Sequence, residues 1–174
     1  MKKIPLLGFI GNSNSGKTTL LTSLIADLTA KGLKIGAVKH HHRSFTIDHE
    51  GKDSQRFTAA GARKTIITGP KQTALIEQTA NQLQLEDLAA SYLQNLDLIL
   101  VEGFKQIEIP KIEVQRQALG LPLLSRGANP DPNLIAVISD LAQTLDVPLF
   151  VPNEISAIST FICCHFALSI QPQA

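Results

Sequence analysis

The sequence predicts an α/β fold of three layers: a mostly parallel sheet with antiparallel edge strands, and helices on both faces. The first observation is an apolar run at residues 6–10, which is typical of a buried strand, followed by residues 18–30 with leucine and isoleucine at helical spacing. The second is a return to strand-type sequence at 33–38, after a helix end at Lys31-Gly32. A β-α-β unit with a right-handed crossover requires parallel strands.

The segment between the first strand and the first helix fits the phosphate-binding loop pattern G-x-x-x-x-G-K-[ST] at residues 11–18. Its glycines allow the backbone to close round a di- or triphosphate, with N–H groups pointing inward. We expect Lys17 to reach the β- and γ-phosphates and the Thr18 hydroxyl to bind Mg²⁺. The strand, loop and helix together indicate a P-loop nucleotide-binding protein. The predicted nucleotide-binding residues are Gly11, Asn12, Ser13, Asn14, Ser15, Gly16, Lys17, Thr18 and Thr19.

Length and charge limit the remaining possibilities. The 174 residues suit one domain, 1–174, and the net charge of +1 gives no case for nucleic acid or a membrane surface as partner. No apolar run approaches the roughly 18 residues of a membrane span, and the N-terminus leads directly into the first strand. We therefore expect a cytoplasmic protein, with the adjacent Cys163 and Cys164 reduced.

The middle of the chain predicts a helix, two short strands, a second helix and a central strand. Asp53 suits the N-cap of a helix that runs to Ala60, and the β-type runs 65–68 and 74–77 flank a Gly-Pro turn. A helical segment with leucines from Leu83 to Leu93 then leads to the apolar run 98–101, which indicates a central strand.

The last third of the chain predicts three more strands and a closing helix. Residues 111–116 alternate polar with apolar, which predicts a half-exposed strand, and its free edge suggests strand pairing in a dimer. A loop rich in Pro and Gly covers 120–132. Residues 134–138 and 147–151 are expected to be strands, and residues 155–169 a helix.

Glu102 ends the apolar run 98–101, where a nucleoside triphosphatase normally places an acidic residue beside the phosphate-binding loop. Because Glu is one methylene longer than the usual Asp, it suits Mg²⁺ held directly or through water, or the polarisation of water. The alternative is a solvated glutamate at a strand end. Lys105 is either an anion contact or a solvated lysine.

Several segments together resemble the molybdopterin-guanine dinucleotide biosynthesis adapter family, MobB. They are GNSNSGKTTL, KHHHRSFTIDHEGKDS, AGA, DLILVEGFK and PKIEV, in this order along the chain. The resemblance implies a GTP-binding, weakly GTP-hydrolysing protein that needs Mg²⁺ and forms a homodimer. It also implies that the protein assists the molybdopterin guanylyltransferase, the enzyme that attaches GMP to molybdopterin. Whether the protein also contacts molybdopterin itself is left open.

The resemblance also implies roles for individual residues. Lys17, Glu102 and Asp48 become the candidate catalytic residues, with Thr18, Glu102 and Asp48 as the candidate Mg²⁺ ligands. Asp48 suits a turn-forming Asx residue equally well. A charged set that contacts an anion or partner comprises Lys39, His40, His42, Lys52 and Asp53.

The sequence has few features that indicate how the nucleotide base is recognised. The Asn-Lys-x-Asp signature for guanine is absent, and only Asp140 stands at the matching strand end. Its carboxylate suits the two N–H groups of guanine, but an aspartate that opens a loop is also a common cap.

Two other functions stay open. A small-molecule kinase would need a lid with arginines over the phosphates, and the loop 120–132 has Arg126 alone. A metallochaperone GTPase would use His40 and His42 with His49. We expect slow hydrolysis, because no glutamine is evidently placed to position water and Arg43, Arg56 and Arg63 have no assigned place.

Overall fold

The computed structural model describes residues 3–41, 45–127 and 130–170. The chain forms two compact units: residues 1–40 with 93–174 make unit 1, and residues 41–92 make unit 2. That residues 1–174 act as one domain stays a prediction.

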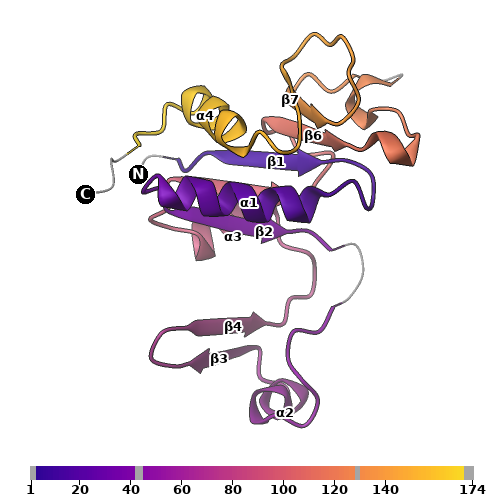
Figure 1. Cartoon of the computed structure of the whole chain (residues 1–174). Coiled ribbons are helices and arrows are strands. Elements are labelled where there is room, and N and C mark those ends of the chain that lie inside the picture. The colour runs from indigo at the N-terminus through magenta and orange to yellow at the C-terminus, as the bar shows by residue number, and fades with distance from the viewer. Residues whose placement is uncertain (1–2, 42–44, 128–129, 171–174) are drawn as a thin grey trace. The chain divides into compact units, whose positions relative to one another are not determined.

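Unit 1 contains a six-stranded sheet in the order β2-β5-β1-β6-β7-β8, and every neighbouring pair is parallel. Figure 1 shows β1, β6 and β7 within this layer. The strands are β1 Leu6–Ile10, β2 Ile35–Lys39, β5 Leu98–Glu102, β6 Lys111–Gln115, β7 Leu134–Ser139 and β8 Leu149–Phe150. The predicted α/β fold with a mostly parallel sheet is thereby confirmed.

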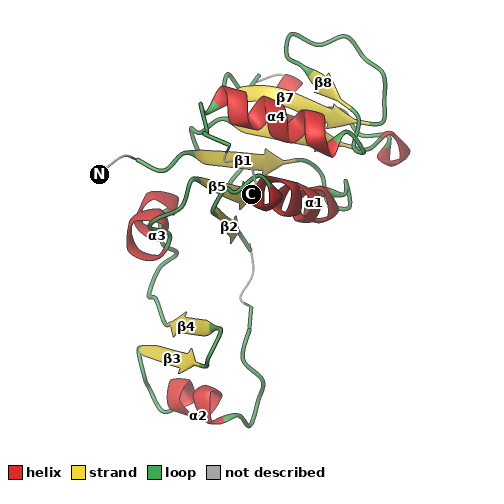
Figure 2. Cartoon of the chain, turned by 60° about the vertical axis from the view of Figure 1, so that its left-hand side comes forward, coloured by secondary structure: helices red, strands yellow, loops and turns green. Residues whose placement is uncertain are grey.

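Helices α1 (Lys17–Ala30) and α4 (Ile155–His165) pack against this sheet and against each other. Figure 2 shows α4 beside β7 and α1 near β1. Leu24 and Leu28 from α1 and Ile158 and Ile162 from α4 are all fully buried in one core cluster with residues of the strands. The apolar stripe predicted for the first helix therefore forms part of the core. Within the described residues, no helix has the length and apolar character to cross a membrane.

Unit 2 holds α2 (Asp53–Ala59), the antiparallel pair β3 (Lys64–Thr68) and β4 (Thr73–Glu77), and α3 (Leu85–Tyr92). The hairpin confirms the two β-type runs, but its strands form their own two-stranded sheet rather than the edge of the large one. The predicted N-cap of this helix is wrong by one residue. Lys52, in extended conformation, is the N-cap, and Asp53 is the first residue of α2. The hydroxyls of Thr58 and Thr65 lie 3.1 Å apart and connect α2 to β3.

The prediction that β6 is a half-exposed strand with a free edge is wrong. β6 lies between β1 and β7, and all five of its residues are buried. Its alternating polar side chains find partners inside the protein instead of water: the Glu113 carboxylate accepts hydrogen bonds from the backbone N–H groups of Leu124 and Ser125, at 2.7 and 3.0 Å. The dimer contact predicted from that edge therefore has no structural basis.

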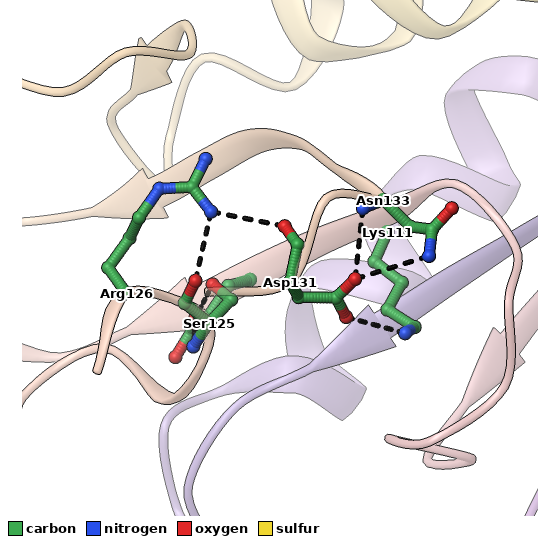
Figure 3. A network of polar contacts seen from close by, with 6 residues as sticks. Lys111, Ser125, Arg126, Asp131 and Asn133 are labelled. Atoms are coloured by element: carbon green, nitrogen blue, oxygen red, sulfur yellow. Dashed lines mark hydrogen bonds and ion pairs between the residues drawn. The ribbon is translucent and has the colours of Figure 1, made fainter. Parts of the chain in front are cut away.

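Lys111 shows the same pattern at the start of β6. Its ammonium is 2.6 Å from an Asp131 carboxylate oxygen, and the other carboxylate oxygen accepts the Asn133 backbone N–H at 2.9 Å (Figure 3). Arg126 adds hydrogen bonds to the backbone carbonyls of Ser125 and Asp131, at 2.9 and 3.2 Å. Polar side chains of β6 thus anchor the segment that follows it.

We expect Asp131→Ala to destabilise the protein by about 3 kcal/mol at neutral pH, because it leaves the buried Lys111 ammonium without its partner. Burial alone raises the pKa of Asp131, but the hydrogen bonds from Lys111 and Asn133 outweigh burial and hold the pKa below its ordinary value. The stabilisation is therefore present above about pH 4 and is lost as the pH falls through the depressed pKa.

Urea unfolding at neutral and at acidic pH measures this effect. Asp146→Ala is the matched control, because Asp146 pairs with Arg126 at 2.8 Å but is 69% exposed. Equal losses for the two variants would contradict a special role for the buried pair.

Candidate functional site

The candidate site lies at the carboxyl ends of three adjacent strands of unit 1. β1 stands between β5 and β6 in the sheet, and the loop of residues 11–16 leads from β1 into α1. Phe9 of β1 and Lys39 of β2 both align with Glu102 of β5. Ligands of open parallel sheets bind at such carboxyl ends, where the chain changes direction across the sheet.

The loop has the backbone that its glycines predict. Gly11 has φ of 144° and Gly16 has φ of 90°, and a Cβ atom on Gly11 would lie 2.2 Å from the Val114 carbonyl oxygen. Side chains at these positions would therefore be strained, and at Gly11 they would also clash with β6. Asn14 also has a positive φ, 62°. Ser15 is buried, and its backbone N–H donates to the Asn12 carbonyl at 3.3 Å.

The Lys17 ammonium lies across this loop. It donates to the carbonyls of Gly11 and Asn12, at 3.2 and 2.6 Å, and to the Ser15 hydroxyl at 3.3 Å. Burial lowers the pKa of Lys17, the Glu102 carboxylate opposes this change, and the ammonium groups of Lys105 and Lys39 lower the pKa further. Three cationic side chains therefore act on the same small region.

Thr18 and Glu102 meet beside the loop. The Thr18 hydroxyl donates to the two Glu102 carboxylate oxygens at 3.3 and 3.2 Å, although the residues are 84 positions apart in the chain. The Lys39 ammonium is 3.4 Å from one of these oxygens. A hydroxyl and a carboxylate are the oxygen donors that Mg²⁺ prefers, so these residues fit the predicted metal. Their role as ligands stays a prediction.

His40 and Phe104 support the position of Glu102. The His40 backbone N–H donates to the Glu102 carbonyl at 2.9 Å, and the two aromatic rings lie 4.5 Å apart. Gly103 has φ of 99°, and a Cβ atom there would come within 2.9 Å of the His40 Cβ. The His40 ring nitrogens are buried. His42, predicted with His40 as an anion contact, lies outside the described residues.

The other residues implied by the resemblance lie in unit 2. Asp48 accepts the His49 backbone N–H at 3.0 Å on one oxygen, while its second oxygen is buried with no hydrogen-bond partner in the described chain. Lys52 and Asp53 are exposed, and Asp53 is 3.6 Å from Arg56. Among residues 3–41, 45–127 and 130–170, no group of three metal-ligating side chains is found. The roles of Asp48, Lys52 and Asp53 stay predictions.

The ends of β6 and β7 hold one predicted residue and one that the sequence reasoning missed. The Asp140 carboxylate accepts the Gln117 backbone N–H at 2.6 Å, which is a capping contact. The missed residue is Arg116, whose Nη2 atom lies 3.2 Å from the position of a Cβ on Gly16. The sequence shows Arg116 as the basic last residue of the strand predicted at 111–116. Its role was overlooked because that strand was placed at an edge of the sheet.

Comparison with known proteins identifies the family. The model of the MobB family, described as molybdopterin guanine dinucleotide synthesis protein B, matches residues 6–140. A Haemophilus influenzae protein named molybdopterin-guanine dinucleotide biosynthesis adapter protein is 40% identical over 161 residues, which cover 92% of this chain and 88% of that protein. An Escherichia coli protein of the same name is 41% identical over 162 residues, or 91% of each chain.

The solved structures agree with the sequence comparison. The crystal structure of a MobB homolog from Bacillus stearothermophilus aligns with a TM-score of 0.66 at 26% identity, and it covers 94% of this chain and 99% of that chain. Bacillus subtilis MobB, with a TM-score of 0.72 at 24% identity and coverage of 98% and 100%, supports the fold alone. The resemblance found in the sequence is thus confirmed, and the chain belongs to the MobB family of molybdopterin guanine dinucleotide synthesis proteins.

Proposed function

We propose that this protein is a GTP-binding adapter that assists the synthesis of molybdopterin guanine dinucleotide and hydrolyses GTP slowly with Mg²⁺. The observation that carries the proposal is the meeting of the phosphate-binding loop with Glu102. Lys17 spans the loop, and Thr18 at the start of α1 hydrogen-bonds the Glu102 carboxylate on the neighbouring strand. The names of the Haemophilus influenzae and Escherichia coli relatives support the adapter role.

Binding of the triphosphate uses groups that the loop already holds in place. Backbone N–H groups at the start of α1, together with the helix dipole, favour an anion at the loop. The Lys17 ammonium exchanges its contacts with the carbonyls of Gly11 and Asn12 for charge-assisted hydrogen bonds to phosphate oxygens. Lys39 and Lys105, which act electrostatically on Lys17, add to the attraction.

Thr18 and Glu102 would hold Mg²⁺, which would supply positive charge beside the phosphates. The Glu102 side chain is only 16% exposed. Its carboxylate lies next to the Thr18 hydroxyl and the Lys39 ammonium. Lys39 balances the charge of the Glu102 carboxylate in the structure, and it would give up this contact if the carboxylate held Mg²⁺.

Slow turnover follows from the neighbours of Glu102. In the described part of the chain, the polar side-chain contacts of Thr18 and Glu102 are with each other and with Lys39, and they involve no glutamine or arginine. Residues of these types position water or stabilise the transition state in fast nucleoside triphosphatases, where an arginine contributes roughly 10³ or more to the rate. This arrangement favours a protein that holds GTP over one that consumes it rapidly.

Titration of the purified protein with GTP and with ATP, each with and without Mg²⁺, tests the proposal. We expect GTP to bind and Mg²⁺ to strengthen the binding, and we expect the loaded protein to capture the molybdopterin guanylyltransferase from solution. Failure to bind any purine triphosphate in magnesium buffer would contradict the proposal. Rapid transfer of phosphate from GTP to a pterin or nucleoside, in preference to water, would indicate a kinase instead.

The finer parts of the proposal have their own tests. We propose a cytoplasmic homodimer, which sedimentation equilibrium at working concentration and fractionation of cells would check. A metallochaperone role for the histidines would require stoichiometric binding of Ni²⁺ or Zn²⁺ that is lost when His40 and His42 are both replaced by alanine.

A further inference from the structure

One face of β6 leads from the core to the phosphate-binding loop. Ile112 and Val114 of β6 are buried in the core cluster that also holds Leu20 of α1. Successive side chains of an extended strand point to opposite faces, so alternate residues share a face. Arg116 follows in extended conformation, with φ of −123° and ψ of 124°, and it continues the face of Ile112 and Val114. Its side chain is thereby directed toward α1, beyond the end of the apolar core.

The Arg116 guanidinium packs against the loop at Gly16. Its Nη2 atom lies 3.2 Å, and its Cζ and Nε atoms 3.9 Å, from the position that a Cβ atom on Gly16 would occupy. Gly16 is the N-cap of α1, and its missing side chain leaves room for this contact. The Arg116 backbone is fixed as well, because its carbonyl accepts the Leu119 N–H at 3.1 Å. A planar cation therefore lies against the backbone of the phosphate-binding loop.

The charge of this guanidinium lacks a carboxylate in contact with it. Within the described residues, no ion pair or hydrogen bond engages the Arg116 side chain, which is exposed. Asp140 follows the neighbouring strand β7, but its carboxylate accepts the Gln117 backbone N–H at 2.6 Å. The first turn of α1, at residues 17–20, has no acidic residue, and the positive end of the helix dipole opposes a cation. An anion on the loop would relieve this accumulation of positive charge.

Arg116 and the residues suited to Mg²⁺ lie on opposite sides of the loop. β5, which carries Glu102, neighbours β1 on one side, and β6 neighbours β1 on the other. The Thr18 hydroxyl donates to the Glu102 carboxylate, so these oxygen donors meet on the β5 side. P-loop proteins hold Mg²⁺ at the β- and γ-phosphates, whereas the loop backbone surrounds the α- and β-phosphates. By this rule, the α- and β-phosphates lie on the side of Gly16 and Arg116.

We infer that Arg116 is a phosphate-binding residue, and that its guanidinium donates hydrogen bonds to the α- and β-phosphates of a nucleotide on the loop. The inference rests on the proposed nucleotide binding, and it adds to Lys17 a second cation on the side opposite Glu102. A guanidinium is planar and presents paired N–H donors, which match phosphate oxygens in a way that an ammonium does not.

A consequence for the nucleotide cycle follows from the phosphates that Arg116 contacts. The α- and β-phosphates stay on the nucleotide when the γ-phosphate is released, so the guanidinium keeps its contacts. Arg116 therefore retains GDP as well as GTP. Retention of the product is consistent with a protein that holds its nucleotide and turns it over slowly.

Isothermal titration with GTP, GDP and inorganic triphosphate tests the role of Arg116. For Arg116→Gln we expect about a tenfold loss of affinity for each ligand, because each has phosphates that the guanidinium contacts. Arg116→Lys keeps the charge without the paired donors, so its losses should be smaller than those of Arg116→Gln. The losses should be the same with and without Mg²⁺, because Arg116 lies away from Thr18 and Glu102.

Two further measurements separate binding from packing. Arg63→Gln, at an exposed arginine of unit 2, is the matched control and should leave all three affinities unchanged. Because the Arg116 side chain is exposed, the nucleotide-free Arg116→Gln variant should unfold at the same temperature as the unaltered protein. Release of a fluorescent GDP analogue from this variant should be about tenfold faster, since most changes of affinity reside in the dissociation rate.

The outcomes distinguish the inference from the proposed function. If the unaltered protein binds neither GTP nor inorganic triphosphate, nucleotide binding fails and the inference fails with it. If GTP binds and Arg116→Gln leaves the affinities for GTP and GDP unchanged, the inference alone is overturned. A loss for GTP without a loss for GDP would assign Arg116 to the γ-phosphate, and a loss for GTP without a loss for inorganic triphosphate would assign it to the nucleoside. Either result would also overturn the inference.

Discussion

Lys17→Ala is expected to weaken GTP binding by about a thousandfold, or roughly 4 kcal/mol. The Lys17 ammonium is held inside the loop by contacts of 3.2 Å to the Gly11 carbonyl and 2.6 Å to the Asn12 carbonyl. Among the described residues, no other cationic side chain donates a hydrogen bond to the loop backbone. Alanine leaves the backbone N–H groups and the helix dipole, which together hold a phosphate only weakly.

Isothermal titration with GTP and with inorganic triphosphate measures this loss. Both ligands should be affected alike, because the contact is to phosphate. Lys34→Ala is the control, since Lys34 is exposed and contacts Asp97 through its backbone N–H and carbonyl, at 2.7 and 2.8 Å. GTP affinity within a few-fold of the unaltered protein would show that Lys17 does not bind the triphosphate.

The pH dependence gives an independent check on Lys17. Burial lowers the pKa of Lys17 in the free protein, against the opposing effect of Glu102. A bound phosphate favours the charged ammonium and so raises the pKa. GTP affinity should therefore be full below the lowered pKa and should decrease as the alkaline pH rises through it. The Lys17→Ala variant should lack this part of the pH dependence.

The fold near the loop could be predicted because its signals are local. A buried strand, a glycine loop and an amphipathic helix follow one another within residues 6–30, and the structure has them as β1, the loop and α1. β6 could not be placed in the same way. Alternation of Lys111, Glu113 and Gln115 with apolar residues is typical of a strand with one wet face, whereas their partners lie far along the chain, at Asp131, Ser125 and Gln143. Such long-range pairing leaves no periodic signal.

The residues of the candidate site differ in the same way: some have a local signal in the sequence, and others are placed by long-range contacts. Glu102 was found because it ends an apolar strand, and the structure brings it to Thr18. Arg116 was missed because its proximity to Gly16 depends on the position of β6 next to β1, which is set by the whole sheet. Asp48 is a different case, because the resemblance singled it out and the structure decides neither interpretation of it. Its carboxylate accepts the N–H of the next residue, His49, at 3.0 Å, whereas an Asx turn would use the N–H two residues on, so its role stays a prediction.

Glu102→Gln is expected to reduce Mg²⁺-dependent turnover of GTP by about a hundredfold or more, while GTP binding stays within a few-fold of the unaltered protein. Glutamine has almost the same shape and keeps an oxygen that can accept from the Thr18 hydroxyl, which lies 3.2 to 3.3 Å from the Glu102 carboxylate oxygens in the unaltered protein. It loses the negative charge that attracts Mg²⁺ and that pairs with Lys39 at 3.4 Å. The phosphate contacts come from the loop, so they persist.

Phosphate release in a single turnover, measured over a range of Mg²⁺ concentrations, tests this expectation. Glu102→Asp keeps the charge and shortens its reach, so it should retain more turnover than Glu102→Gln and should need more Mg²⁺. Glu108→Gln, at an exposed glutamate, makes the same chemical change away from the strand end and should have no effect. Unchanged turnover in Glu102→Gln would mean that the ion is held elsewhere, because the carboxylate beside Thr18 is the charge that this substitution removes.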